Sequence, residues 1–213
     1  MSEMLAERYR CIRSASERLI EGLTAEDTQA PLKWHLAHTT WFFETFILER
    51  FETGFVAHRD SFRFLYNSYY NGIGDQYPRP NRGLITRPTL DEVIDYRHAI
   101  DCRMTLLMQQ ENEVQEETRS LIELGLQHEQ QHQELMMTDL KHLFSLNPEG
   151  PVYRPGSEEI SLNTNTPSWI HFEGGVTEIG KQGNGFAFDN ESPRHRVYLE
   201  PYQLASHLVT ELE

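Results

Sequence analysis

Cysteine, basic residues and long apolar runs are all scarce in this chain of 213 residues. The two cysteines, Cys11 and Cys102, lie far apart and in no motif, so they are interpreted as reduced thiols. No apolar run approaches the roughly 20 residues of a membrane-spanning helix. The N-terminal segment MSEMLAERYRCIRSASERL also lacks the apolar stretch of a signal peptide. We therefore expect a cytoplasmic protein that has no membrane partner.

The charge balance is strongly acidic. With 33 acidic and 19 basic side chains, the formal net charge is −14 at pH 7. A general nucleic-acid-binding protein would normally be basic, so no nucleic-acid partner is expected. Apolar residues at 38% and aromatic residues at 11% suffice for a hydrophobic core and are too many for a disordered chain. Histidine, in contrast to cysteine and the basic residues, is abundant, with ten residues.

The larger, N-terminal part of the chain is predicted to be helical. Apolar residues recur near helical spacing in residues 4–23, 31–54, 90–111 and 114–146. Thr89 and Glu92 have the spacing of a capping box at the start of the third segment. The second segment is apolar around much of its circumference, so we expect it at the centre of a helical bundle. Residues 1–147 are thus predicted to be a mainly α domain.

Three other segments differ from this helical pattern. Residues 55–87 hold several glycines and prolines with tyrosines between them, and long loops of this kind are often functional. Residues 148–166 are rich in the small and turn-forming residues that are typical of a linker. Residues 167–213 read as short strands and turns, which predicts the opening of a β-rich domain.

The sharpest local signal is a pair of histidines, His128 and His132, at helical spacing i and i+4. Their side chains lie on one face of a helix and can share a metal ion, whereas the alternative is a solvated polar face. The segment also matches the zinc-protease pattern H-E-x-x-H, with Glu129 as the general base. The metzincin extension of that pattern needs a histidine where Thr138 stands, and no downstream helix offers a glutamate ligand. A protease is therefore disfavoured.

A second pair, His35 and His38, lies near the start of the apolar helix predicted over residues 31–54. Because the two histidines are three residues apart, they point in somewhat different directions. We expect one to be a core histidine that is hydrogen-bonded to a backbone carbonyl or a neighbouring polar group. The other could complete a three-histidine site with His128 and His132, since bundles bind metals through side chains that project inward from facing helices.

Two arginines, Arg79 and Arg82, lie in the proline-rich part of residues 55–87. Arginine binds carboxylates in a bidentate manner, so an arginine pair near a metal suggests an anionic substrate. The alternative is a structural pair that bridges to Asp75, Asp91 or Glu92.

Four long segments of the sequence resemble the ergothioneine-biosynthesis sulfoxide synthases. Three lie in the predicted helical domain and its loop, and the fourth lies in the predicted β-rich segment. They are LKWHLAHTTWFFETFIL, YNSYYNGIGDQYPRPNRGLITRPTLDEVIDYR (with Tyr66 where the family pattern has Phe), LGLQHEQQHQELMM and GGVTEIGKQGNGFAFDNESPRHRVYLEPYQLASHLVT. The motifs are long, occur in the family's order and cover essentially the whole chain.

The resemblance implies both a fold and an activity. Residues 1–147 would be a DinB-like four-helix bundle, and residues 167–213 would open a formylglycine-generating-enzyme-like domain of the C-type-lectin-like α+β class. The family is an iron-dependent oxidoreductase that binds non-haem Fe(II) through three histidines, which match His38, His128 and His132. It uses O2 to join a cysteine-type thiol, cysteine or γ-glutamylcysteine, to C2 of the imidazole of hercynine.

The resemblance suggests roles for two arginines, and general ligand chemistry suggests roles for three residues near the histidines. Arg79 and Arg82 match positions that hold the carboxylates of the thiol substrate in related members. Each imidazole ligand should donate its other N–H to a nearby acceptor, and Glu129, Gln131 and Glu134 are candidates for that acceptor.

In one large respect the chain departs from the family, whose second domain is much longer than residues 167–213. The hercynine-binding residues and the catalytic tyrosine of the family are therefore expected beyond residue 213, and this chain is expected to be incomplete for catalysis. Close relatives in ovothiol or selenoneine pathways, a DinB-like divalent-metal-dependent thiol S-transferase and a non-catalytic metal-binding bundle are the alternatives. The sequence indicates neither the thiol nor the oligomeric state.

Overall fold

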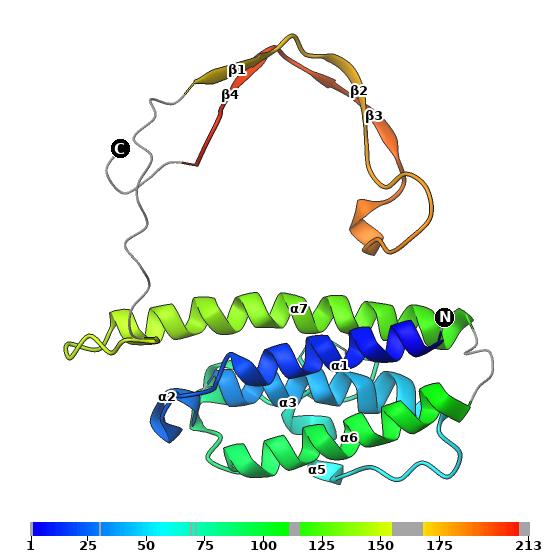
Figure 1. The fold of residues 1–213 in the computed structure, drawn as a ribbon, viewed down its shortest axis with the longest axis vertical. Coiled ribbons are helices and arrows are strands. Elements are labelled where there is room, and N and C mark those ends of the chain that lie inside the picture. Colours follow the sequence, from blue (N-terminus) through cyan, green and yellow to red (C-terminus); the bar gives the residue numbers. More distant parts are fainter. Residues whose placement is uncertain are drawn as a thin grey trace. The chain divides into compact units, whose positions relative to one another are not determined.

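The computed structural model describes residues 2–29, 31–68, 70, 72–110, 116–154 and 168–208. It divides the chain into two compact units, Met1–Pro155 and Gly156–Glu213. The first unit is helical and the second carries the strands (Figure 1). The chain is therefore mainly α, with a small antiparallel β region at its C-terminal end.

The first unit is built from helices of very different lengths. They are α1 (Ser2–Arg18), α2 (Ala25–Gln29), α3 (Leu32–Phe43), the π-helix η1 (Glu44–Leu48), α4 (Glu49–Phe51), α5 (Asp60–Leu65), the 3₁₀-helix η2 (Arg79–Leu84), α6 (Leu90–Gln110) and α7 (Glu116–Ser145). Among the residues that the structure describes, no helix combines the length and the apolar character needed to cross a membrane.

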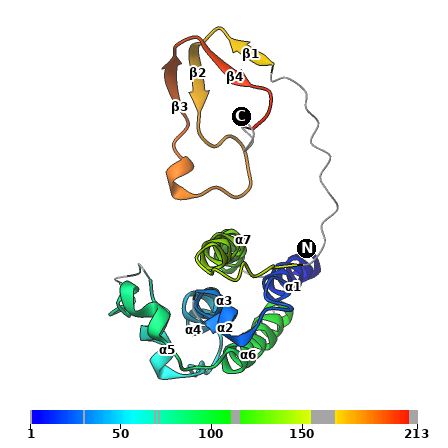
Figure 2. The same cartoon turned by 90° about the vertical axis from the view of Figure 1, so that its left-hand side faces the viewer.

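Helix α3 lies at the centre of this unit, as its apolar circumference predicts. All of its side chains are buried, and it packs against both α6 and α7. Helix α1 packs against the same two helices, so the four long helical segments lie side by side when viewed along their axes (Figure 2). Because α3 and α7 are neighbours, the two histidine pairs of the sequence come from adjacent helices.

Gly125 allows α7 to pack closely against α3. A Cβ atom at this position would lie 2.6 Å from Cε1 of Phe43, inside the van der Waals contact distance. The Phe43 ring is fully buried, with its centroid 5.0 Å from that of Tyr9. Any side chain at position 125 would therefore push the two helices apart or displace a packed ring.

Helix α6 begins as the sequence predicts, because the capping box at Thr89 and Glu92 is present. The Thr89 N–H donates to Glu92 Oε2 at 2.8 Å, and the Glu92 N–H donates to Thr89 Oγ1 at 3.2 Å. The predicted end of this helix and the predicted start of the next fall within residues 111–115, which lie outside the described residues.

Other boundaries were predicted wrongly. Helix α1 ends at Arg18 rather than at residue 23, and Gly22 adopts a left-handed φ of 81° in the turn that follows. Helix α2 was not predicted, and the predicted helix over residues 31–54 contains the π-helix η1. The predicted loop over residues 55–87 contains α5, which is held in place by its buried Phe62, and η2.

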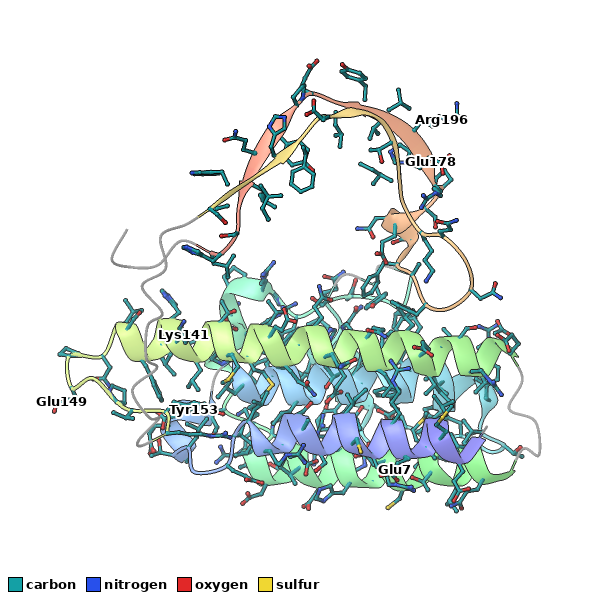
Figure 3. All side chains as sticks on the ribbon, turned by 45° about the horizontal axis from the view of Figure 1, so that its top comes forward. Glu7, Lys141, Glu149, Tyr153, Glu178 and Arg196 are labelled. Carbon is teal, nitrogen blue, oxygen red and sulfur yellow. The ribbon has the colours of Figure 1, made fainter. Side chains whose placement is uncertain are left out.

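The described start of the predicted linker packs on the helical unit. Tyr153, labelled in Figure 3, donates from its hydroxyl to the Leu19 carbonyl at 2.7 Å, and Arg154 donates to the Arg18 carbonyl at 3.0 Å. Residues 155–167 lie outside the described residues.

The second unit contains two two-stranded antiparallel sheets. Strand β1 (Trp169–Phe172) pairs with β4 (Tyr202–Ala205), and β2 (Gly175–Ile179) pairs with β3 (His195–Leu199). Glu178 and Arg196, labelled in Figure 3, face each other across β2 and β3. Large apolar side chains on these strands are exposed: Trp169, Ile170, Phe172, Val176, Ile179, Tyr198, Tyr202 and Leu204.

Candidate metal centre

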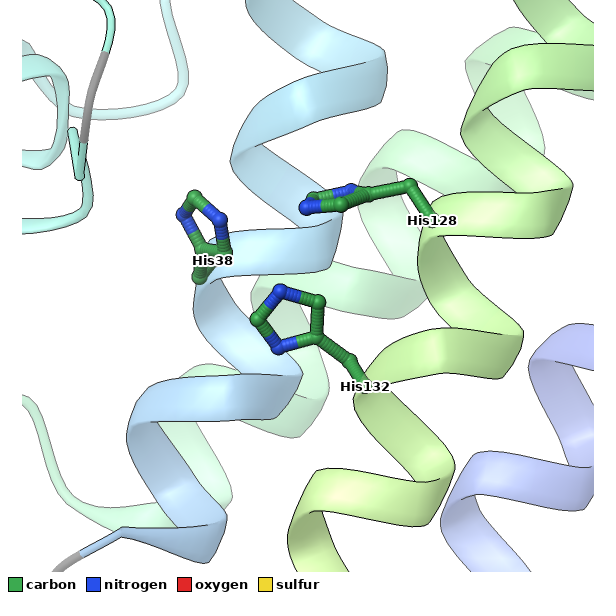
Figure 4. Close-up of side chains that lie close together, drawn as sticks. All are labelled: His38, His128 and His132. Carbon is green, nitrogen blue, oxygen red and sulfur yellow. The ribbon is translucent and has the colours of Figure 1, made fainter. Parts of the chain in front are cut away.

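Three histidines from two adjacent helices converge in the helical unit. His38 comes from α3, and His128 and His132 come from successive turns of α7 (Figure 4). Each offers one ring nitrogen, and these three atoms all lie within 4.8 Å of one another. The ring centroids are 4.5 to 5.0 Å apart. The structure thus brings together the three residues that the sequence suggested as metal ligands.

A backbone hydrogen bond orients the His38 ring. Its Nδ1 lies 2.6 Å from the carbonyl oxygen of Tyr66, which can only accept a hydrogen bond. Nδ1 therefore carries the hydrogen, and Nε2 keeps the lone pair that can bind a metal. The ring also stacks on Trp34, with the centroids 4.6 Å apart and the planes 13° from parallel. These contacts hold His38 in one orientation.

His35, the other histidine of α3, has both ring nitrogens engaged by protein groups. Its Nδ1 lies 2.6 Å from Nδ1 of His132, and its Nε2 lies 3.0 Å from Oδ2 of Asp139. His35 is therefore the hydrogen-bonded core histidine that was expected at one of the two positions. Its Asp139 partner was missed from the sequence, although it follows His132 by seven residues and so lies on the same helix face.

Burial keeps the candidate ligands neutral. It lowers the pKa of His128 to about 4, with a further lowering by nearby His35. Burial and the neighbouring imidazoles also hold the pKa values of His38 and His132 well below the usual value for histidine. All three imidazoles are therefore uncharged at neutral pH, which is the form that binds metals.

The residues present fit a transition-metal ion. One ring nitrogen of each histidine lies within 4.8 Å of the other two, which is close enough for the three to share one ion. A set of three neutral imidazoles suits iron, zinc, copper or nickel rather than magnesium or calcium.

The histidines open onto a cavity of about 580 Å³ that the two predicted arginines also line. The Arg82 guanidinium lies over the Trp34 ring at 3.9 Å from its centroid, and its Nη2 donates to Ser68 Oγ at 3.2 Å. Glu92, one of the acidic partners considered for the arginines, pairs instead with Arg59. The cavity therefore combines a neutral nitrogen cluster with two cationic side chains.

Asp139, Ser68, Trp34 and Tyr70 also line this cavity, and sequence reasoning did not assign any of them to the site. Only Asp139 had a usable signal. His128, His132, Leu135 and Asp139 follow one another at intervals of four, three and four residues, and all four line the cavity. That spacing marks a single face of α7.

Glu129 does not face the imidazoles, so its predicted role as a hydrogen-bond acceptor for them is wrong. Its carboxylate is buried and accepts from Arg13 at 2.8 Å, Arg97 at 2.9 Å and Ser16 at 2.5 Å. Burial alone would raise the pKa of Glu129, but the two arginines hold it below the usual range. Because both arginines bind this carboxylate, Glu129 is not placed to act as the general base of a zinc protease, the alternative that the sequence already disfavoured.

The other two predicted acceptors are not the ring partners found. Gln131 lines the cavity, and Glu134 is exposed. The partners of the ligand rings are the Tyr66 carbonyl for His38 and the His35 ring for His132.

In comparisons with known proteins, no protein-family model and no curated protein matches this chain.

Proposed function

We propose that this chain is the metal-binding part of a non-haem Fe(II)- and O2-dependent sulfoxide synthase. The enzyme would join a cysteine-type thiol to the imidazole C2 of hercynine, as the resemblance to the ergothioneine-biosynthesis family implies. The observation that carries the proposal is the shared cavity. Three neutral imidazoles and two arginines line one space, which suits a metal ion together with a substrate that carries carboxylates.

The chain's own residues have two tasks in this proposal. His38, His128 and His132 would hold the metal ion, and Arg79 and Arg82 would hold the thiol substrate by its carboxylates. A bound Fe(II) supplies the redox chemistry that couples C–S bond formation to the reduction of O2. The overall reaction balances, because one oxygen atom enters the sulfoxide and the other leaves as water with the thiol hydrogen and the C2 hydrogen.

The stacking of Arg82 on Trp34 supports its proposed role. The indole face and Ser68 hold the guanidinium at the cavity wall, so less side-chain freedom is lost when a carboxylate binds. The neutral imidazoles add no positive charge that would compete with the arginines for the carboxylate.

The proposal also assigns a fold to each of the two units. The packing of α1 and α3 against α6 and α7 supports the DinB-like four-helix bundle that the resemblance implies. Residues 167–213 would be the N-terminal portion of a formylglycine-generating-enzyme-like domain. Its exposed apolar strand faces are consistent with further elements packing on them. Those elements would supply the hercynine pocket and the catalytic tyrosine.

Thiol binding to the metal-loaded chain tests the substrate part of the proposal. We expect Arg82→Ala to weaken binding of cysteine or γ-glutamylcysteine by about 10- to 100-fold, since hydrogen bonds to charged groups contribute about 1.5–3 kcal/mol. Metal affinity should stay unchanged. Arg63→Ala is the matched control, because Arg63 pairs with Glu49 outside this cavity. Loss of metal together with thiol binding would mean that Arg82 is structural.

O2 consumption tests the reaction class and uses a chain that carries the complete second domain. We expect Fe(II)-dependent O2 uptake that requires both hercynine and a thiol, with the sulfoxide as product. Retention of zinc without O2 uptake would instead favour the divalent-metal-dependent thiol S-transferase. Use of a different imidazole or of a selenium donor would favour an ovothiol or selenoneine relative.

A further inference from the structure

Asp139, His35 and His132 form a hydrogen-bonded row that leads to the candidate metal centre. Asp139 Oδ2 lies 3.0 Å from Nε2 of His35, and Nδ1 of His35 lies 2.6 Å from Nδ1 of His132. The Asp139 side chain is 41% exposed, whereas both histidines are buried. The row thus begins at a partly exposed carboxylate on α7, crosses to α3 and returns to α7.

The chemistry of these groups sets the direction of each hydrogen bond. A carboxylate can only accept, so Nε2 of His35 must carry the hydrogen that it donates to Asp139. In a neutral His35 ring, Nδ1 is then the acceptor. Nδ1 of His132 must therefore be the donor in the bond between the two rings, which leaves the lone pair of His132 on Nε2.

We propose that Asp139 and His35 are positioning residues that hold His132 in the Nδ1–H tautomer and in the orientation that presents Nε2 to a metal ion. The proposal rests on the metal site proposed above. Metal-binding histidines usually donate their second N–H to a carboxylate or a carbonyl, which fixes the ring and strengthens it as a ligand. His38 does this directly with the Tyr66 carbonyl, and for His132 a second imidazole stands between ligand and carboxylate.

The same geometry separates the two histidines of α3 by role. If His35 were itself a ligand, it would have to release its bond to His132 or its bond to Asp139. His38 needs no such rearrangement, because among the described residues its Nδ1 alone is engaged, by a carbonyl. His35 also lines the cavity, but its ring nitrogens face His132 and Asp139, and its ring lies edge-on to His132 at a centroid distance of 4.9 Å.

The tautomers can be measured directly in the metal-free protein, without any substitution. Long-range ¹H–¹⁵N correlation of the histidine side chains near pH 7.5 reports which ring nitrogen carries the hydrogen. We expect His132 to be protonated at Nδ1 and His35 at Nε2. A His132 ring protonated at Nε2 would overturn the proposal, whatever the metal affinity.

Metal affinity tests the consequence, with Co²⁺ as the probe and its visible absorption as the signal. His35→Phe removes the acceptor for His132 and should weaken Co²⁺ binding about 10- to 100-fold. His35→Asn places an amide oxygen near the position of Nδ1 and should restore most of the affinity. Asp139→Ala should cause a smaller loss than His35→Phe. Glu134→Ala, which removes an exposed carboxylate from the same helix, should cause none.

The outcomes also show whether the proposed positioning role of Asp139 and His35 is wrong or the proposed metal site itself is wrong. If His132→Ala loses Co²⁺ while His35→Phe and Asp139→Ala bind it like the wild type, the positioning role is wrong and the metal site stands. If His132→Ala itself retains full affinity, the metal site is wrong and the positioning role fails with it. Should His35→Phe not fold, the tautomer measurement on the wild-type protein still decides.

Discussion

His128 and Glu129 are neighbours on α7, yet their side chains enter two different polar clusters. Glu129 belongs to what we call the paired cluster, made of Arg13, Ser16, Arg97, Asp101 and Glu129. His128 belongs to the imidazole cluster, made of His35, His38, His128 and His132. Each cluster joins α7 to other helices of the first unit. The two clusters reduce the free-energy cost of burying polar groups in different ways.

In the paired cluster, buried charges compensate one another. Arg13 bridges Asp101 and Glu129, and Arg97 donates to the second oxygen of Glu129 and to the Leu36 carbonyl. Buried ions are tolerated only when they are paired and hydrogen-bonded in this way. The hydrogen bonds leave the Glu129 carboxylate no role toward a ligand, so the cluster is structural.

In the imidazole cluster, charge is avoided instead of compensated. Burial and the neighbouring imidazoles keep His38, His128 and His132 neutral, one buried ring nitrogen lacks a partner among the described residues, and a cavity adjoins the cluster. The comparison shows that the degree of pairing, and not burial or polarity alone, separates a structural cluster from a candidate binding site. The following predictions perturb the paired cluster, then the imidazole cluster, and then the packing of α7 on α3.

The largest effect on stability is expected when the paired cluster is broken. Glu129→Ala leaves Arg13 and Arg97 buried without their shared carboxylate, which should lower the free energy of unfolding by about 3–5 kcal/mol. Chemical denaturation of the metal-free protein measures this loss. Glu134→Ala is the matched control on the exposed side of α7 and should stay within about 0.5 kcal/mol of the wild type. A Glu129→Ala protein of wild-type stability would contradict the structural role of Glu129.

The next largest effect is expected in the pH dependence of stability, which differs between the two clusters. The pKa values of His38, His128 and His132 are lowered on folding from about 6.5, so their contribution to stability is fully present above pH 6.5 and is lost as pH falls toward the folded pKa, about 4 for His128. Each histidine that gains a proton only on unfolding contributes about 1.4 kcal/mol per pH unit in that window. Glu129, whose pKa is also lowered, loses its contribution only below about pH 4.3.

Unfolding of the metal-free protein at pH 7.5, 6 and 5 checks this order. We expect a steady loss of stability from pH 6.5 downward, and a smaller loss when His128 is replaced by Phe. Stability that is constant between pH 7 and pH 5 would mean that the imidazoles are not held neutral by burial.

The smallest effect is expected at Gly125, which sets the approach of α7 to α3. In Gly125→Ala the new methyl group meets the buried Phe43 ring, beside the Arg13 guanidinium at 5.3 Å from that ring's centroid. Overpacking typically costs about 1–3 kcal/mol, which offsets the gain of about 1 kcal/mol in helix propensity. We expect a net loss of about 1 kcal/mol together with weaker metal binding, measured by denaturation and by Co²⁺ titration. Increased stability would show that the Phe43 ring can move freely.

Local patterns predicted the long helices and the histidine pair on α7. The Thr89 and Glu92 capping box is encoded within four residues, and the spacing of His128 and His132 follows from the helical repeat alone. The short helices α2 and α5 and the π-helix η1 were missed because tertiary packing decides them. Phe62, for example, anchors α5 from within a segment that contains many turn-forming residues.

Long-range pairing is what the sequence could not indicate. Spacing could not choose between His35 and His38, because both lie on α3, and the choice depends on hydrogen bonds to Asp139 and the Tyr66 carbonyl. The partners of Glu129 come from residues more than thirty positions away, on α1 and α6. Without them, the most conspicuous carboxylate of the H-E-x-x-H segment could be mistaken for a functional group.

Metal titration of the ligand variants tests the central claim most directly. We predict that the wild-type chain binds one Fe(II) or Co²⁺ ion, measured anaerobically by equilibrium dialysis, and that His38→Ala, His128→Ala and His132→Ala bind none. His142→Ala, which removes an exposed histidine from the same helix α7, should bind one ion with wild-type affinity. One ion bound with unchanged affinity in His132→Ala would contradict the claim that these three imidazoles form a metal centre.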